Sequence, residues 1–294
     1  MARALFDALP AAVEAPAPPR PARVWAAELS LRLERRGDRT VLAHAHHRGP
    51  LRVQKALYPE TEGRADVLIL HPPAGIAGGD HLSLHVELTP GAQARITTPG
   101  AAKWYRASGR AAFQDTHLKI ADGAVLEWLP QEAIAFDGAQ PCTRTDIDCT
   151  KDARGCGWDL WMLGRLAAGE TFASGELRQR TRLRRDGRLL WSERIRLAAD
   201  DPLRRSPLGW NDAGVIGSFW IIGLPNDESL LASCREIAEP GVQIGITRFE
   251  HGLWIARALG HSAEKVRTAL TRIWSQVRPT LCGATGVPPR IWAT

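Results

Sequence analysis

Residues 81–100, HLSLHVELTPGAQARITTPG, carry the pattern that decides the fold. Within 81–88 every second residue is apolar, which is typical of a β-strand with one buried and one exposed face. The turn-forming Thr89-Pro90-Gly91 follows, and a second strand-like run begins at residue 94. The stretch therefore predicts two short strands joined by a tight turn.

The same alternation extends outward to about residue 201. It recurs at 29–34, 67–70, 116–120 and 125–128, with turn-forming residues between the runs. Many short strands separated by turns predict a mainly β protein, as a sandwich, a barrel or a solenoid-like stack. Because no strict repeat is present, the residues alone leave these three architectures open.

One hairpin can be aligned residue by residue. Asp186-Gly187 is a type I′ turn signal between two strand-like runs. A two-residue turn there predicts that Arg182 lies opposite Trp191 and that Arg180 lies opposite Glu193.

The sequence pattern changes after residue 201. Strand-like runs at 215–222, 242–249 and 253–259 alternate with two helical segments. The first helix is expected near 227–239, and the second has Ser262 as its N-cap and Pro279 as its stop. These segments predict a small C-terminal α+β unit with two helices.

Three regions follow from these patterns. Residues 1–20 form a Pro- and Ala-rich arm, whose composition predicts disorder. Residues 21–205 form a β-rich scaffold, and 206–294 form the α+β unit packed on it. The longest uncharged apolar stretch, 213–226, is shorter than the roughly 20 residues needed to cross a bilayer, so no membrane association is expected.

Composition indicates where the protein acts. Its five cysteines form no CxxC motif, which predicts free thiols in a reducing cytoplasm. The apolar stretches near the N-terminus are interrupted before they reach the length of a signal peptide's core. A cytoplasmic protein is therefore expected.

The charge balance leaves one alternative function open. Lys and Arg number 38 against 32 Asp and Glu, a net charge of +6. Arg178, Arg180, Arg182 and Arg184 share one face of a predicted strand, which makes a basic stripe. Aromatic residues do not interleave with it, which favours a solvated or protein-docking face. A basic nucleic-acid-binding β protein remains the alternative.

Tests for catalytic motifs indicate no enzyme. The glycine-rich segment 71–80, HPPAGIAGGD, places Gly-Asp where a phosphate-binding loop needs Gly-Lys, so nucleotide binding is rejected. Its Gly75, Gly78 and Gly79 are expected to permit positive φ and close backbone approach in a tight turn. Neither a GxSxG nor an HExxH motif is present.

Histidine clusters also fall short of a metal site. His81 and His85 lie four residues apart on one strand, which places them about 13 Å apart, too far to share one metal ion. A metal-dependent hydrolase built on Asp80, His81 and His85 would need those side chains to converge. The cluster at 44–47 is expected to be a polar strand face rather than a metal trap.

Six ordered segments together resemble one known family. They are HPPAGIAGGD at 71–80, TTPGAAKWYR at 97–106, LEWLPQE at 126–132, FDGA at 136–139, LGR at 163–165 with GE at 169–170, and PRIW at 289–292. Over nearly its whole folded length the chain resembles the UreD family, also called UreH, of urease accessory proteins.

The resemblance implies a fold and a function. The fold would be an irregular β-helix-like stack of many short strands, with two helices near the C-terminus. The function would be that of a non-enzymatic scaffold or chaperone that assists nickel insertion into the urease apoprotein. Its partners would be UreF, through UreF the GTPase UreG, and the urease apoprotein. No tightly bound cofactor is implied, and nickel would be cargo.

The resemblance also implies site residues. Asp80, Asp159 and Glu193 match acidic positions implicated in an internal nickel path in the family. Oxygen ligands hold a first-row divalent ion more loosely than imidazole or thiolate would, as a conduit requires. Two positions depart from the family pattern, since Ala74 stands where many relatives carry glycine and Ala102 stands where a serine often occurs.

Overall fold

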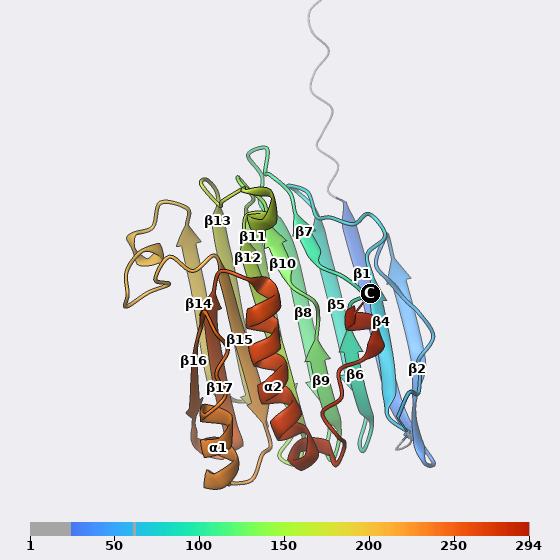
Figure 1. Cartoon of the computed structure of the whole chain (residues 1–294). Coiled ribbons are helices and arrows are strands. Elements are labelled where there is room, and N and C mark those ends of the chain that lie inside the picture. Colours follow the sequence, from blue (N-terminus) through green and yellow to red (C-terminus); the bar gives the residue numbers. More distant parts are fainter. Residues whose placement is uncertain (1–24, 61–62, 294) are drawn as a thin grey trace, which may run out of the picture.

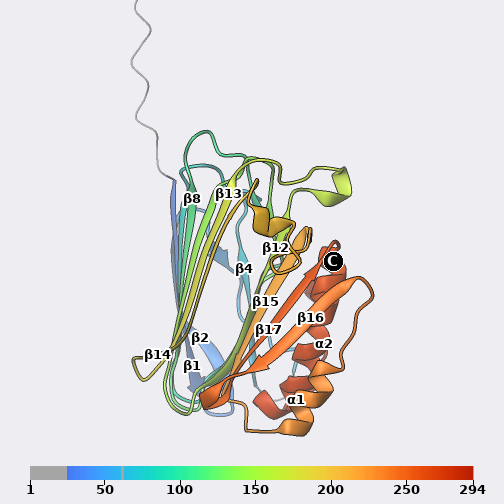
Figure 2. The same cartoon turned by 90° about the vertical axis from the view of Figure 1, so that its left-hand side faces the viewer.

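Two large β-sheets pack face to face in the computed structural model, which describes residues 25–60 and 63–293 (Figures 1 and 2). In spatial order the seven-stranded sheet consists of β14 (Arg188–Ala198), β13 (Glu176–Arg185), β11 (Pro141–Cys149), β8 (Ala112–Ile120), β5 (His81–Leu88), β1 (Ala26–Arg36) and β2 (Arg39–Arg48). The ten-stranded sheet consists of β16 (Val242–Arg248), β17 (Leu253–Gly260), β15 (Val215–Ile222), β12 (Arg154–Leu163), β9 (Val125–Leu129), β6 (Gln93–Thr97), β4 (Ala65–Leu70) and β3 (Arg52–Val53), with β10 (Ala133–Ala135) and β7 (Ala102–Trp104) attached beside β12.

The chain winds between the sheets as a solenoid does. From β4 to β13 it passes from one sheet to the other and back, and each new strand adds in parallel to the strand laid down one coil earlier. The positive φ of Gly91 and Gly123 forms the tight turns β5–β6 and β8–β9. Of the three architectures that the alternation allows, the structure is therefore the β-helix-like stack, and the mainly β fold is confirmed.

Alternating residues build the core between the sheets. On β5, Leu82, Leu84, Val86 and Leu88 point inward and are buried, whereas His81 and His85 are exposed. Fully burying each such leucine or valine contributes about 1.5–3 kcal/mol. The pattern in 81–88 is thus confirmed.

A second core lies on the outer face of the ten-stranded sheet. Helix α2 (Ala263–Cys282) covers β12, β15 and β17 there, and α1 (Glu228–Arg235) packs beside α2 (Figure 2). Strand β15 is consequently buried on both faces, which explains why its sequence is almost continuously apolar.

A β-bulge overturns the predicted hairpin register. Asp186 and Gly187 form the two-residue turn with φ of 50° and 78°, as expected. Leu190 has no partner in the ladder, so beyond it Arg182 lies opposite Ser192 and Arg180 opposite Arg194. The extra residue shifts every later pair by one position. Glu193 therefore lies opposite Thr181, and its side chain joins the inner face.

Proline does not end the second helix. Ser262 caps α2 as predicted, with its Oγ accepting from the Lys265 N–H, but α2 continues through Pro279 to Cys282. Leu281, within this last turn, is buried, and Gly283 ends the helix with φ of 75°. Burial of the final turn outweighs the one backbone hydrogen bond that proline removes. Helix α1 ends at Arg235, four residues before the expected Glu239.

The C-terminal strands continue the scaffold's sheet. Strand β15 pairs antiparallel with β12, so the ten-stranded sheet runs across the proposed 205/206 boundary. The predicted arm at 1–20 lies outside the described residues. Across residues 25–60 and 63–293, no helix is both long enough and apolar enough to span a bilayer.

Candidate functional site

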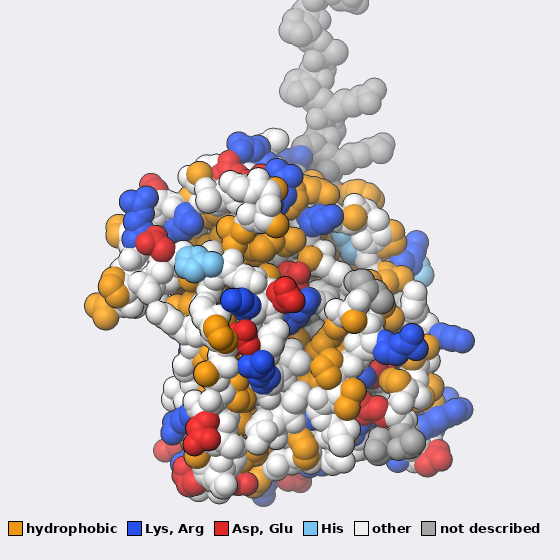
Figure 3. All heavy atoms as spheres, in the orientation of Figure 1, with side chains coloured by type: hydrophobic (Ala, Val, Ile, Leu, Met, Phe, Trp, Pro, Cys, Tyr) orange, Lys and Arg blue, Asp and Glu red, His pale blue; other side chains and the backbone are white. Residues whose placement is uncertain are grey.

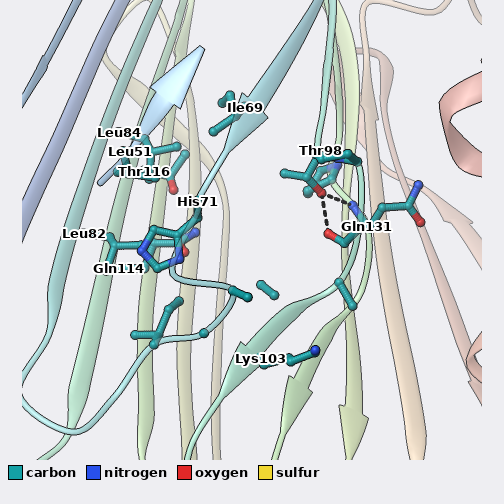
Figure 4. A pocket seen from close by; sticks show the side chains of 18 of the residues that line it. Leu51, Ile69, His71, Leu82, Leu84, Thr98, Lys103, Gln114, Thr116 and Gln131 are labelled. Atoms are coloured by element: carbon teal, nitrogen blue, oxygen red, sulfur yellow. Dashed lines mark hydrogen bonds between the residues drawn. The ribbon is translucent and has the colours of Figure 1, made fainter. Parts of the chain in front are cut away.

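A cavity of about 270 Å³ lies between the sheets, and the glycine-rich segments form much of its wall. In Figure 4, His71 and Gln114 lie on one side of it and Thr98 and Gln131 on the other. Residues 98–103 contribute a continuous stretch of wall, and 74–76 contribute another. Segments far apart in the sequence therefore meet around one internal space.

Backbone hydrogen bonds hold these segments together. The Ile76 N–H donates to the Lys103 carbonyl (2.7 Å), and the Tyr105 N–H donates to the Ile76 carbonyl (2.9 Å). The Gln131 N–H donates to Thr98 Oγ1 (2.9 Å). The wall is therefore built from paired backbone rather than from free loops.

The glycines of segment 71–80 have different roles. Gly79 has a φ of 95°, as expected, but the other positive φ belongs to Ala74, at 62°. Gly75 is needed for close approach, because a Cβ atom there would lie 2.1 Å from the Tyr105 ring. Gly78 likewise lies against the Arg110 carbonyl. The expectation of positive φ was therefore right for Gly79 alone among the three.

Polar side chains continue from the cavity along the gap between the sheets. On the seven-stranded sheet, Thr116, Thr145, Thr181 and Glu193 occupy one row of paired positions. On the ten-stranded sheet the corresponding row is Asp159, Ser218 and Arg257. We call these seven residues, together with Gln179, the polar seam. Inward positions of two packed sheets are normally apolar, so a continuous polar row requires a specific explanation.

Asp159 and Glu193 lie together within the seam. The Gln179 amide donates to Asp159 Oδ2 (2.9 Å), and Ser218 Oγ donates to Glu193 Oε2 (3.3 Å). Burial, and then the nearby negative charge of Glu193, raises the pKa of Asp159 to about 7, although the Gln179 hydrogen bond opposes the rise. Asp159 also lines the cavity, so its carboxylate faces the internal space.

Arg257 marks the outer end of the seam. Its guanidinium reaches across the gap and donates to Glu193 Oε1 through both Nε (3.1 Å) and Nη2. The Glu193 side chain is 13% exposed and that of Arg257 is 49% exposed. Asp159, Ser218 and Glu193 are only partly exposed, whereas Arg257 is exposed, so the seam meets solvent at the arginine.

The family model for the UreD urease accessory protein matches residues 26–293. The chain belongs to the UreD family. It is 46% identical to the urease accessory protein UreD of Dechloromonas aromatica (strain RCB) over 275 residues, which covers 92% of this chain and 95% of that protein. It is 45% identical to the UreD proteins of Azoarcus sp. (strain BH72) and Pseudomonas fluorescens (strain Pf0-1), with coverage of 92% of this chain and 94% and 95% of theirs.

Asp80, the third acidic residue expected in a UreD path, lies apart from the other two. Its Oδ2 accepts from the Ala77 N–H (2.8 Å), which closes the turn of segment 71–80. Asp80 does not line the cavity, but its negative charge acts on His71, which does: burial lowers the pKa of His71, and the Asp80 charge partly opposes that shift. The structure thus brings Asp159 and Glu193 together and leaves Asp80 outside the cavity lining, close enough to His71 to affect its pKa.

The histidines of this UreD-family chain do not converge on a metal site. His81 Nε2 pairs with Asp115 Oδ2 (2.8 Å), and His85 stacks on His117 with ring centroids 4.9 Å apart. Within the described residues, no group of three His, Cys, Asp or Glu side chains could hold a metal ion. The hydrolase built on Asp80, His81 and His85 therefore lacks its required geometry.

The arginine stripe on β13 is partly neutralised. Arg180, Arg182 and Arg184 all contact Asp146 on the neighbouring strand β11. Burial alone would raise the pKa of Asp146, but the hydrogen bond and charge of Arg182 lower it. On the opposite face of the molecule, Lys and Arg are interspersed with Asp, Glu and apolar side chains (Figure 3). Nucleic-acid binding stays an untested prediction with little electrostatic support.

Sequence reasoning missed Gln179, Ser218 and Arg257. Gln179 could have been found, because it lies at the same inward-facing positions of β13 as Leu177 and Leu183. Ser218 likewise interrupts the apolar run of β15. Arg257 could not be placed, because its role depends on which strand of the facing sheet lies across from it.

Proposed function

We propose that this UreD-family chain assists nickel insertion into the urease apoprotein as a non-catalytic scaffold, and that nickel crosses it through the cavity and the polar seam. The observation that carries the proposal is the pairing of Asp159 and Glu193 at the end of a cavity walled by family segments. Two adjacent inward carboxylates are costly unless water or a cation compensates them. A transiting divalent cation would supply that compensation.

The donor set fits transport better than storage. Carboxylate and hydroxyl oxygens from Asp159, Glu193 and Ser218 bind a first-row divalent ion more weakly than histidine or thiolate does. The cysteines Cys149 and Cys156 are buried, and burial raises the pKa of both thiols, which disfavours the metal-binding thiolate. Nickel is therefore proposed to be cargo that the seam releases.

The proposed partners are UreF, through it the GTPase UreG, and the urease apoprotein. GTP hydrolysis is assigned to UreG, in keeping with the Gly-Asp pair that replaces the Gly-Lys of a phosphate loop in this sequence. The proposed location is the cytoplasm, where the five free thiols would stay reduced.

Co-purification with the partner proteins followed by urease activation tests this function. Asp80→Ala and Glu193→Ala are expected to lower the nickel content and activity of urease without loss of the complex. Glu239→Ala is the matched control, because Glu239 forms an ion pair of similar exposure with Arg272 away from the cavity. Normal activation by both test variants would remove the basis for the path.

A further inference from the structure

Both carboxylate oxygens of Glu193 already have hydrogen-bond partners. Arg257 takes Oε1 through two N–H groups, and Ser218 takes Oε2. Asp159, the nearest other carboxylate, faces the cavity and receives the Gln179 amide. A cation that reaches Asp159 from the cavity therefore meets a second carboxylate already bound to a guanidinium.

The Arg257 side chain spans two separate layers. Arg257 belongs to β17 of the ten-stranded sheet, whereas Glu193 belongs to β14 at the edge of the seven-stranded sheet. The contact is thus a cross-sheet bridge at the point where the seam reaches solvent. Within its own sheet, Arg257 lies beside Ser218, which in turn lies beside Asp159.

Charge explains why an arginine is suitable there. The negative charge of Glu193 acts on the nearby Asp159 carboxylate, so a positive group beside Glu193 offsets the repulsion between the two. The Arg257 guanidinium, which donates two N–H groups to Glu193 Oε1, supplies this charge permanently. A divalent cation between the two carboxylates would provide the same compensation with twice the charge.

We infer, resting on the nickel path proposed above, that Arg257 is a tethered counter-ion that closes the Glu193 end of the seam and that a divalent cation binds between Asp159 and Glu193 by displacing it. The Arg257 side chain is 49% exposed, so solvent can hydrate the released guanidinium. Its stem stays fixed on β17, so the guanidinium returns when the cation leaves. Arg257 therefore sets how tightly the seam holds its cargo.

Cation affinity of the isolated full-length protein tests this role. Mn²⁺ is the probe, because it prefers carboxylate oxygens to imidazole and so avoids the exposed histidines. Free Mn²⁺ is measured by electron paramagnetic resonance during titration. Arg257→Gln is expected to tighten Mn²⁺ binding about two- to fivefold, in line with loss of one partly exposed ion pair.

Arg272→Gln is the matched control. The Arg272–Glu239 pair has side-chain exposures of 53% and 12%, close to those of Arg257 and Glu193, and its loss changes the net charge equally. It should leave Mn²⁺ affinity unchanged. Thermal unfolding of each variant checks that the fold is retained.

Further variants separate this role from the path itself. Glu193→Gln and Asp159→Asn should each weaken Mn²⁺ binding, and adding Glu193→Gln to Arg257→Gln should abolish the gain in affinity.

If the carboxylate variants bind Mn²⁺ like the wild type, both the cation site and the counter-ion role are wrong. If they weaken binding but Arg257→Gln brings no gain, only the counter-ion role is overturned. If Arg257→Gln tightens binding while Asp80→Ala and Glu193→Ala both still activate urease normally, the counter-ion role stands and the nickel path fails.

Discussion

The ionised Asp159 side chain lowers the stability of the folded protein. Its pKa rises from 3.8 to about 7 on folding, so between these values the folded state binds more protons than the unfolded state, and stability falls as the pH rises through this window. A shift of this size corresponds to at most about 4 kcal/mol, and cavity water reduces it. Asp159→Asn should therefore raise the free energy of unfolding by about 1–2 kcal/mol at pH 7.5 and leave it nearly unchanged at pH 4.

Urea denaturation of wild type and variant at the two pH values measures this difference. The exposed Asp148→Asn is the control, and it should show no comparable pH-dependent gain. Equal stabilisation by Asp159→Asn at both pH values would mean that the asparagine acts through packing rather than through removal of a buried charge.

Ala74 is strained by its backbone conformation. Its φ of 62° places a Cβ atom in the left-handed region, which costs a non-glycine residue about 1 kcal/mol. Ala74→Gly should therefore stabilise the protein by about 0.5 kcal/mol or more, after the greater freedom of glycine in the unfolded chain is subtracted. Thermal unfolding measures the change. Ala77→Gly, three residues later and outside the left-handed region, should not stabilise, and equal gains for both would contradict the role of strain.

At the scale of elements, sequence reasoning succeeded where local alternation sets the structure. The bounds of β5 follow from an apolar residue at every second position, and those of β15 follow from a short, almost continuous apolar run. It failed where packing against a neighbouring element determines the local structure. The bulge at Leu190 and the passage of α2 through Pro279 both depend on packing that no local pattern encodes.

In the candidate site, too, local sequence patterns do not reveal which residues lie together. Asp159 and Glu193 were identified only through resemblance, since nothing local separates them from other acidic residues. Their proximity depends on β12 and β14 lying in facing sheets, so it is a property of the coiled chain. Arg257 enters the site from a third strand, which is why its role becomes visible only in three dimensions.

Helix α2 is fixed to its sheet by a buried ion network. Arg278 donates to Glu127 (2.9 Å) and to Glu60 (2.7 Å), and both Arg278 and Glu127 are at most 1% exposed. Arg278→Met should destabilise the protein by about 3–5 kcal/mol, because it leaves a buried carboxylate unpaired. Combining it with Glu127→Gln should recover part of the loss. Urea denaturation measures both, and a cost near that of the exposed Arg272→Met would contradict a role for the network.

For the whole molecule, the two layers give the cavity and the helices separate roles. The first core and the polar seam lie between the sheets, whereas α1 and α2 pack outside the ten-stranded sheet (Figure 2). A substitution that fills the cavity therefore leaves the helical face unchanged. The proposed nickel transport and the proposed partner binding should therefore be separable by mutation.

Ala102 provides the means to separate them, because it lines the cavity at the start of β7. Ala102→Phe should obstruct the internal space and lower nickel incorporation into urease severalfold while the partner proteins still co-purify. Ala102→Ser, which adds a hydroxyl group in nearly the same volume, should activate urease at least as well as wild type. The nickel content of purified urease measures both effects, with thermal unfolding as the check on the fold. Full activation by a stably folded Ala102→Phe variant would show that nickel does not pass this wall, because a blocked cavity cannot serve as a conduit.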